Sequence, residues 1–153
     1  MLIWLLQHDR LSLDEVADGL ENSSGLAGLA CLPGGSGDMR DVHAAAQSGS
    51  SDARLAIDVH AHRLRREIAA MAAAMNGLDA LVFTGGIGEH QSAVRAQAAG
   101  LSFLGVAVDQ DANRRATADA DVSAPAAAVR TLVITAREDL EIARQARAAL
   151  AER

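Results

Sequence analysis

Apolar side chains recur at helical spacing along much of the chain, and short continuous apolar runs separate these stretches. The longest periodic stretch covers about 51–76, where apolar residues follow one another at intervals of three, four and seven. This spacing predicts a long amphipathic helix that ends at Gly77. Its apolar stripe is expected at Ile57, Leu64, Ile68, Met71 and Met75.

The first part of the chain carries further helix signals. The apolar residues 1–7 predict a short buried helix, although their length alone also fits a strand. Ser12 followed by Glu15 is typical of a capping box, which predicts that a second helix begins there. Turn-forming residues at 22–25 end that helix, and the Gly- and Pro-rich segment 32–37 is expected to form a loop.

The second half of the chain alternates predicted strands and helices, which favours an α/β layered domain. We expect strands over 78–84, 103–108 and 129–134, a helix over 89–99 that ends at Gly100, a helical turn followed by a loop over 109–128, and a closing helix over 138–151. A length of 153 residues suits one domain, which we expect to span 1–153.

Composition and charge exclude several classes of function. The net charge is −6 and no basic block is present, so bulk attraction to nucleic acid or to an anionic membrane is not expected. The apolar runs end well short of the roughly 20 residues that span a bilayer, and residues 1–7 lack the features of a secretory signal. Cys31 is the single cysteine, which excludes an internal disulfide and favours a cytoplasmic location.

The segment Thr84–Glu89, with Gly85, Gly86 and Gly88, is the sharpest local signal for chemistry. It follows a predicted strand and precedes a predicted helix, so we expect a tight turn there. Glycines permit positive φ and close approach of a ligand to the backbone. The N–H groups at the start of the helix suit an anion, so a ribose or a phosphate fits this geometry. A tight turn without a ligand is the alternative, and the spacing matches neither a Rossmann nor a Walker A motif.

A second candidate segment, Asp38–Asp41, follows the predicted loop. Asp38 has the chemistry to hydrogen-bond a sugar hydroxyl, and the Arg40 guanidinium can grip a phosphate or lie flat over a base. The alternative is a helix N-terminus, in which Gly37 or Asp38 is the cap and Arg40 pairs with a nearby acid.

A third candidate is the acidic pair Glu138 and Asp139, which opens the last predicted helix just after a strand. Carboxylates there suit Mg²⁺, since that ion prefers oxygen ligands and keeps several waters. The alternative is that two acids in a first turn complement the helix dipole.

Taken in order, these segments resemble the C-terminal part of acetate kinases. The resemblance covers nearly the whole chain, and the run Phe83–Glu89 is specific to the acetate/propionate kinase family. The matching segments are Asp38–Asp41, Leu78–Glu89, Gly100–Val106 with Asp109 and Asn113, and Ile134 with Glu138–Arg144.

The resemblance implies a fold and an activity. The fold is the C-terminal lobe of the actin/Hsp70/sugar-kinase (ribonuclease H-like) superfamily, here incomplete, with a mixed sheet flanked by helices. The activity is reversible transfer of the γ-phosphoryl group of ATP to acetate with Mg²⁺, which gives ADP and acetyl phosphate. The resemblance also implies a cytoplasmic homodimer whose contact is supplied by this lobe.

The resemblance also assigns site residues. The nucleotide-contacting positions of the family fall on Asp38, Met39, Arg40, Gly86, Ile87, Gly88, Glu89 and His90, and the glutamate associated with Mg²⁺ falls on Glu138. Two departures from the family pattern stand out. His90 replaces the usual Asn, and Thr135–Arg137 stands where Pro-Thr-Asn is common.

Family members are much longer than this chain, and their catalytic and acetate-pocket residues lie in segments that it lacks. The resemblance therefore implies no catalytic residue here and no activity of this chain alone. Acetate or propionate would bind only when the missing lobe is supplied, and the sequence does not choose between them or a butyrate kinase–like specificity. The alternatives are a non-catalytic nucleotide-binding or dimerisation module, or one part of a split kinase.

Overall fold

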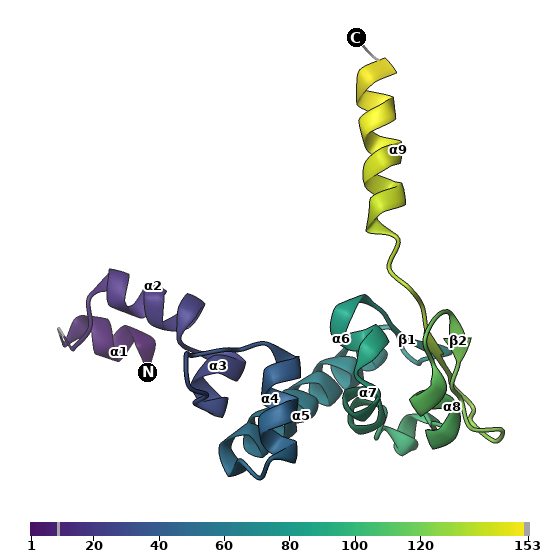
Figure 1. The fold of residues 1–153 in the computed structure, drawn as a ribbon, viewed down its shortest axis with the longest axis horizontal. Coiled ribbons are helices and arrows are strands. Elements are labelled where there is room, and N and C mark those ends of the chain that lie inside the picture. The colour runs from purple at the N-terminus through teal and green to yellow at the C-terminus, as the bar shows by residue number, and fades with distance from the viewer. Residues whose placement is uncertain (9, 152–153) are drawn as a thin grey trace. The chain divides into compact units, whose positions relative to one another are not determined.

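The computed structural model of the protein describes residues 1–8 and 10–151 (Figure 1). By its internal contacts the chain divides into two compact units. Unit 1 is Met1–Leu64 and unit 2 is Arg65–Arg153. The boundary falls within the long helix α5, Ser51–Ala74. The expectation of one domain over 1–153 stays a prediction. Among the described residues, no helix is both long enough and apolar enough to traverse a bilayer.

The described residues of unit 1 form helices joined by short connections. These are α1 (Leu2–Gln7), α2 (Leu13–Asn22), α3 (Gly25–Ala30), α4 (Met39–Gln47) and the first part of α5. The segment 32–37 contains no helix or strand, as predicted. Helix α3 was not predicted, because two of its six residues are glycine, a poor helix former.

The capping box at the start of α2 is confirmed. The Ser12 hydroxyl accepts a hydrogen bond from the Glu15 N–H at 3.2 Å. In return, the Glu15 carboxylate accepts the Ser12 N–H at 2.7 Å. These bonds lower the pKa of Glu15 below its ordinary value. Helix α2 therefore begins where the sequence predicts, because its first orphan N–H groups have partners.

Helix α1 is confirmed as a helix, but the prediction that it is buried is wrong. Ile3 is 70% exposed and Trp4 is 51% exposed. Trp4 stacks on His8 with ring centroids 4.6 Å apart, so its neighbour is a residue one turn along the same segment. Apolar character alone does not bury a six-residue helix, because burial requires an opposing surface.

Helix α5 buries alanine where the sequence pattern favoured larger side chains. Its buried positions are Ala53, Ala56, Ile57, Ala61 and Ala72. The predicted apolar stripe is right at Ile57 and wrong at Met71 and Met75, which are 56% and 63% exposed. Small residues let neighbouring elements approach the helix backbone, so the alanine face packs inward and these large side chains remain outside.

Helix α5 ends in a hydrogen-bonded left-handed cap. Asn76 has φ of 59°, and its N–H donates to the Ala73 carbonyl at 3.2 Å. The N–H of Gly77 donates to the Ala72 carbonyl at 2.9 Å. This is the pattern of a Schellman motif, with Asn76 in the left-handed position. The helix thus stops where predicted, although the residue that turns the chain is Asn76 and not Gly77.

Unit 2 contains a small mixed sheet in the order β1-β3-β2. Strands β1 (Ala80–Phe83) and β3 (Arg130–Val133) are parallel, with Leu81 opposite Thr131. Strand β2 (Ala120–Asp121) pairs antiparallel with β3. Side chains alternate between the faces of β1, so Leu81 and Phe83 are buried while Val82 is 49% exposed. The α/β class and the mixed sheet with helices are confirmed.

Four helical segments connect β1 to β2, and one helix follows β3. They are α6 (Gly85–His90), α7 (Ser92–Ala98), the 3₁₀ helix η1 (Ser102–Leu104), α8 (Gln110–Arg115) and α9 (Glu138–Ala151). The closing helix over 138–151 is confirmed with its bounds. The single helix predicted over 89–99 is wrong at its start. The glycines themselves form α6, and Gln91, with ψ of 80°, interrupts the helix before α7.

The strand predicted over 103–108 is also wrong. Phe103 lies in the 3₁₀ helix and is 74% exposed. Gly105 follows with φ of 85°, a conformation that does not continue a strand. Only Val106 and Val108 pair, each through an isolated bridge, with Val129 and Ser123 respectively.

Candidate nucleotide-binding site

The glycine segment, Thr84–His90, directly follows β1, and each of its glycines has a different structural setting. Gly85 has φ of 72°, which L side chains rarely adopt. A Cβ atom on Gly88 would lie 3.2 Å from the main-chain carbonyl carbon of Phe83, so Gly88 permits close packing against the strand. A Cβ atom on Gly86 would meet nothing within 4 Å. The bend is therefore open beside Gly86, where a ligand could approach the backbone.

Glu89 accepts one of the helix-start N–H groups that the sequence pattern predicted to be available for an anion. Its Oε1 atom accepts the N–H of Gly85 at 2.9 Å and the N–H of Ala136 at 2.8 Å. Helix α6 has only six residues, and one N–H of its first turn is already paired within the chain. The open side of the bend consequently suits a sugar or a base better than a phosphate held by the helix start.

Arg95 in α7 holds the end of α6 from inside unit 2. It is 1% exposed, and its Nη1 donates to the carbonyls of Gly88 and Glu89 at 2.8 and 2.7 Å. Its Nε and Nη2 donate to the side-chain and main-chain oxygens of Asn113, each at 2.7 Å. Asn113 in turn donates to the Ser92 carbonyl at 2.8 Å. Burial lowers the pKa of Arg95 below its ordinary value.

Arg95 was not predicted from the sequence as part of this site. One sequence feature could have identified Arg95: it is the one charged residue in the Ala- and Val-rich helix Ser92–Ala98. A charged residue within an apolar face is either exposed or fully hydrogen-bonded, because an unpaired buried charge is costly. The sequence does not show which carbonyl groups supply the bonds.

The segment after β3, Thr135–Arg137, is held by Asp119. The Asp119 carboxylate accepts the Thr135 N–H at 2.8 Å and the Arg137 Nη2 at 2.7 Å. The hydrogen bond from Arg137 is the main cause that lowers the pKa of Asp119. Thr135 and Arg137 thus have local hydrogen-bond partners in this chain. The segment leads directly into Glu138, the first residue of α9.

Glu138 is the predicted cation ligand, and it is exposed in the first turn of α9 together with Asp139. The described residues hold no group of three or more His, Cys, Asp or Glu side chains arranged to bind a metal. Mg²⁺ keeps several waters and often shares its remaining positions with substrate phosphates. A single exposed carboxylate therefore fits Mg²⁺ that arrives with a nucleotide, and does not amount to a protein cage.

In unit 1, Asp38, Met39 and Arg40 form the start of α4. The Asp38 carboxylate caps the helix by accepting the Arg40 N–H at 2.8 Å, and it pairs with the Arg40 guanidinium at 2.6 Å. This pairing holds the pKa of Asp38 down at about 2. Met39 is 4% exposed, so its side chain belongs to the core. The cap and ion pair are confirmed, and the nucleotide role of these residues stays a prediction.

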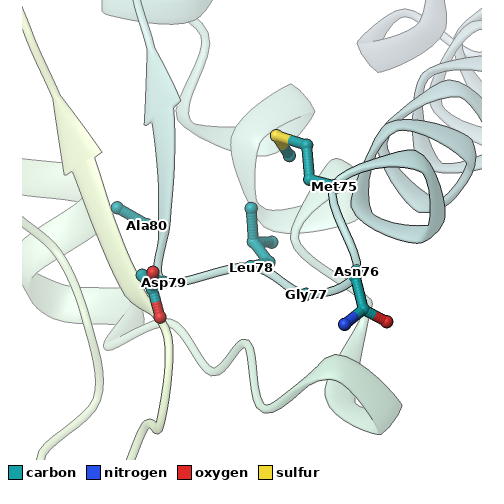
Figure 2. Close-up of a pocket in the computed structure, with 6 residues that line it drawn as sticks. All are labelled: Met75, Asn76, Gly77, Leu78, Asp79 and Ala80. Carbon is teal, nitrogen blue, oxygen red and sulfur yellow. The ribbon is translucent and has the colours of Figure 1, made fainter.

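A separate hollow of about 360 Å³ lies at the connection between α5 and β1 (Figure 2). Its lining is Met75, Asn76, Gly77, Leu78, Asp79 and Ala80. It precedes β1, whereas the glycine segment follows β1. None of the predicted site residues lines this hollow.

Comparison with known proteins decides the family. The sequence profile described as the Acetokinase family matches residues 1–144. The chain belongs to the acetokinase family. This confirms the resemblance on which the predicted site residues rest, and it places the glycine segment, Asp38–Arg40 and Glu138 inside the matched region.

Relatives of known name and structure agree with the family profile. An acetate kinase of Clavibacter sepedonicus is 44% identical over 151 residues, which cover 97% of this acetokinase-family chain and 37% of the relative. A crystal structure of Porphyromonas gingivalis acetate kinase superposes with a TM-score of 0.86 at 29% identity, covering 97% of this chain and 37% of that one. A Francisella tularensis propionate kinase structure gives a TM-score of 0.79 at 32% identity, covering 91% and 35%. The chain thus spans little more than a third of the length of these relatives.

Proposed function

We propose that this chain is the nucleotide-holding part of an acetate kinase–type phosphotransferase that converts ATP and acetate to ADP and acetyl phosphate, reversibly. The observation that carries the proposal is the family match over residues 1–144. This matched region includes the bend that is open beside Gly86. Residues 1–153 act as one domain that binds adenine nucleotide. Acetate or propionate binds only together with the rest of the family fold.

Each unit carries proposed nucleotide contacts, Asp38–Arg40 in unit 1 and Gly86–His90 in unit 2. Without a Cβ at Gly86, the ribose or adenine can lie against main chain. The Asp38 carboxylate is ionised at neutral pH, since its pKa is about 2, and it can accept a hydrogen bond from a sugar hydroxyl. Arg40, with an 80% exposed side chain, has donors left for a phosphate or a face for a base.

Glu138 would be the residue that holds Mg²⁺, in company with water and the nucleotide phosphates. The cation supplies charge neutralisation at the transferring phosphoryl group. The chain itself contributes binding and orientation of the nucleotide, and we assign no catalytic residue to it. Phosphoryl transfer depends on positioned positive charge around the reacting group. The 153-residue chain alone is therefore expected to form no acetyl phosphate above background.

Calorimetric titration with ADP in the presence of Mg²⁺ tests this function. We expect a dissociation constant of about 1 mM or lower, as for a typical small-metabolite site. Gly86→Val should weaken binding at least about tenfold, because its methyl groups would occupy the surface meant for the ligand. Gly19→Val is the matched control: a Cβ there also meets nothing within 4 Å, and Gly19 lies in α2 of unit 1. No ADP binding, or equal weakening by both substitutions, would contradict the proposal.

A second candidate is a non-catalytic nucleotide-binding and dimerisation module, or one part of a split kinase. The observation that favours it is the coverage of only 35–38% of the length of the related acetate kinases. Adding the missing lobe as a separate polypeptide separates the two roles. A split kinase should then form acetyl phosphate, whereas a binding module should still bind ADP without turnover. We further propose a cytoplasmic homodimer, which sedimentation of the purified chain tests.

A further inference from the structure

The Glu89 carboxylate lies where two segments that we assign to the ligand meet. One is the glycine segment, whose Gly85 N–H donates to Glu89 Oε1 at 2.9 Å. The other is the connection after β3, whose Ala136 N–H donates to the same oxygen at 2.8 Å. Ala136 is 47 residues further along the chain than Glu89 and only two before Glu138. A single oxygen atom thus joins the proposed nucleotide contact to the segment that carries the proposed cation ligand.

Both ends of this link are themselves fixed. The main-chain carbonyl of Glu89 accepts a hydrogen bond from the buried Arg95 at 2.7 Å, which holds the residue in place within α6. On the other side, Asp119 holds the residues that flank Ala136, through the Thr135 N–H at 2.8 Å and the Arg137 guanidinium at 2.7 Å. The carboxylate therefore connects two segments, each of which has further hydrogen bonds of its own.

We propose that Glu89 is a positioning residue, which sets the separation between the glycine segment and Glu138 through its hydrogen bonds to Gly85 and Ala136. This inference rests on the proposed function, because it assigns both segments to one Mg²⁺–nucleotide ligand. Both N–H groups share one acceptor oxygen, so the link depends on an acceptor at that position and not on the charge of the group. The Glu89 side chain acts on the ligand through the backbone that it orients, so the nucleotide contact that we assign to residue 89 is made by its main chain and not by its carboxylate.

The pair Glu89→Gln and Glu89→Ala tests this role. Both bonds end on the same oxygen, so the single amide oxygen of Gln can accept both of them, whereas Ala can accept neither. Amide hydrogen exchange at Gly85 and Ala136, measured by NMR, reports the link without any ligand. Exchange at both amides should be at least about tenfold faster in Glu89→Ala and within about threefold of the parent in Glu89→Gln. Glu67→Ala, an exposed carboxylate of α5, is the control that should change neither amide.

ADP titration with and without Mg²⁺ then reports the consequence for the ligand. The parent chain and Glu89→Gln should both bind ADP more tightly when Mg²⁺ is added. Glu89→Ala should lose that gain, because Glu138 no longer lies at a fixed distance from the glycine segment. Equal loss in Glu89→Gln and Glu89→Ala would overturn the inference, since it would mean that the charge itself contacts the ligand. Unchanged amide exchange in Glu89→Ala would also overturn it, whereas absence of ADP binding by the parent chain would instead refute the proposed function.

Discussion

Replacing Arg95 by Ala is the most demanding test of how unit 2 is held together. The substitution removes the donors for both oxygens of Asn113 and for the carbonyls of Gly88 and Glu89. Asn113 is only 1% exposed. Each buried acceptor left without a partner costs about 1–3 kcal/mol. Gly88 and Glu89 are half-buried and can recover water, so we count only the two oxygens of Asn113. This gives a loss of about 4 kcal/mol, a large share of the roughly 5–15 kcal/mol that stabilises a typical domain.

Urea denaturation followed by far-ultraviolet circular dichroism measures this loss. With a slope of about 1–3 kcal/mol per molar urea, the midpoint should fall by about 2 M in Arg95→Ala. Arg95→Lys keeps the charge but not the planar arrangement of donors, so the urea midpoint of this variant should fall by about half as much. Arg66→Ala is the control: Arg66 has a 61% exposed side chain and pairs with Glu67, and its loss should cost less than about 0.5 kcal/mol. An Arg95→Ala midpoint equal to that of Arg66→Ala would refute the reasoning.

Three further predictions concern single positions. Gly105→Ala should cost about 2 kcal/mol of unfolding free energy in the same urea assay, because φ is 85° and the new Cβ would lie 2.9 Å from the Ala128 Cβ; an unchanged midpoint would contradict this. The pKa of Asp38, measured by NMR titration of its carboxyl group, should be about 2 and should rise toward its ordinary 3.8 in Arg40→Ala. Since the folded-state pKa of Asp38 is the lower one, the stability that it contributes is present above pH 3.8 and is lost as the pH falls toward about 2. Ser12→Ala should cost about 1 kcal/mol and speed amide exchange in the first turn of α2, an effect that a mere surface hydroxyl would not produce.

Patterns confined to a few neighbouring residues were predicted well. The capping box of Ser12 and Glu15, the end of α5 before Gly77 and the closing helix over 138–151 are set by local hydrogen bonding and periodicity, which the sequence shows directly. Strand β1 was found because it is a short run of apolar residues just before the glycine segment, and β3 was found within the predicted strand 129–134 although Arg130 and Thr131 are polar.

Features that depend on contacts between distant residues were not predicted. Phe103 looks like part of a strand, but pairing partners and the left-handed Gly105 decide the local conformation. Met71 and Met75 fit the helical period, yet alanines occupy the buried face of α5. The hydrogen bond between Glu89 and Ala136 joins residues that are 47 positions apart, and no local sequence pattern predicts it. In the site, the glycine segment was found by its composition, whereas Arg95 and Asp119 were not found, because their roles lie in bonds to main-chain groups elsewhere.

The alanine-lined face of α5 in unit 1 changes how mutational sensitivity should be measured there. Ala53, Ala56 and Ala61 end at Cβ, so an alanine scan has nothing to remove at any of them and would report this face as silent. Enlarging these side chains is the informative change, because a larger side chain at a buried alanine overfills the core at a cost of about 1–3 kcal/mol. A valine scan is consequently the experiment that would map the contacts of this face.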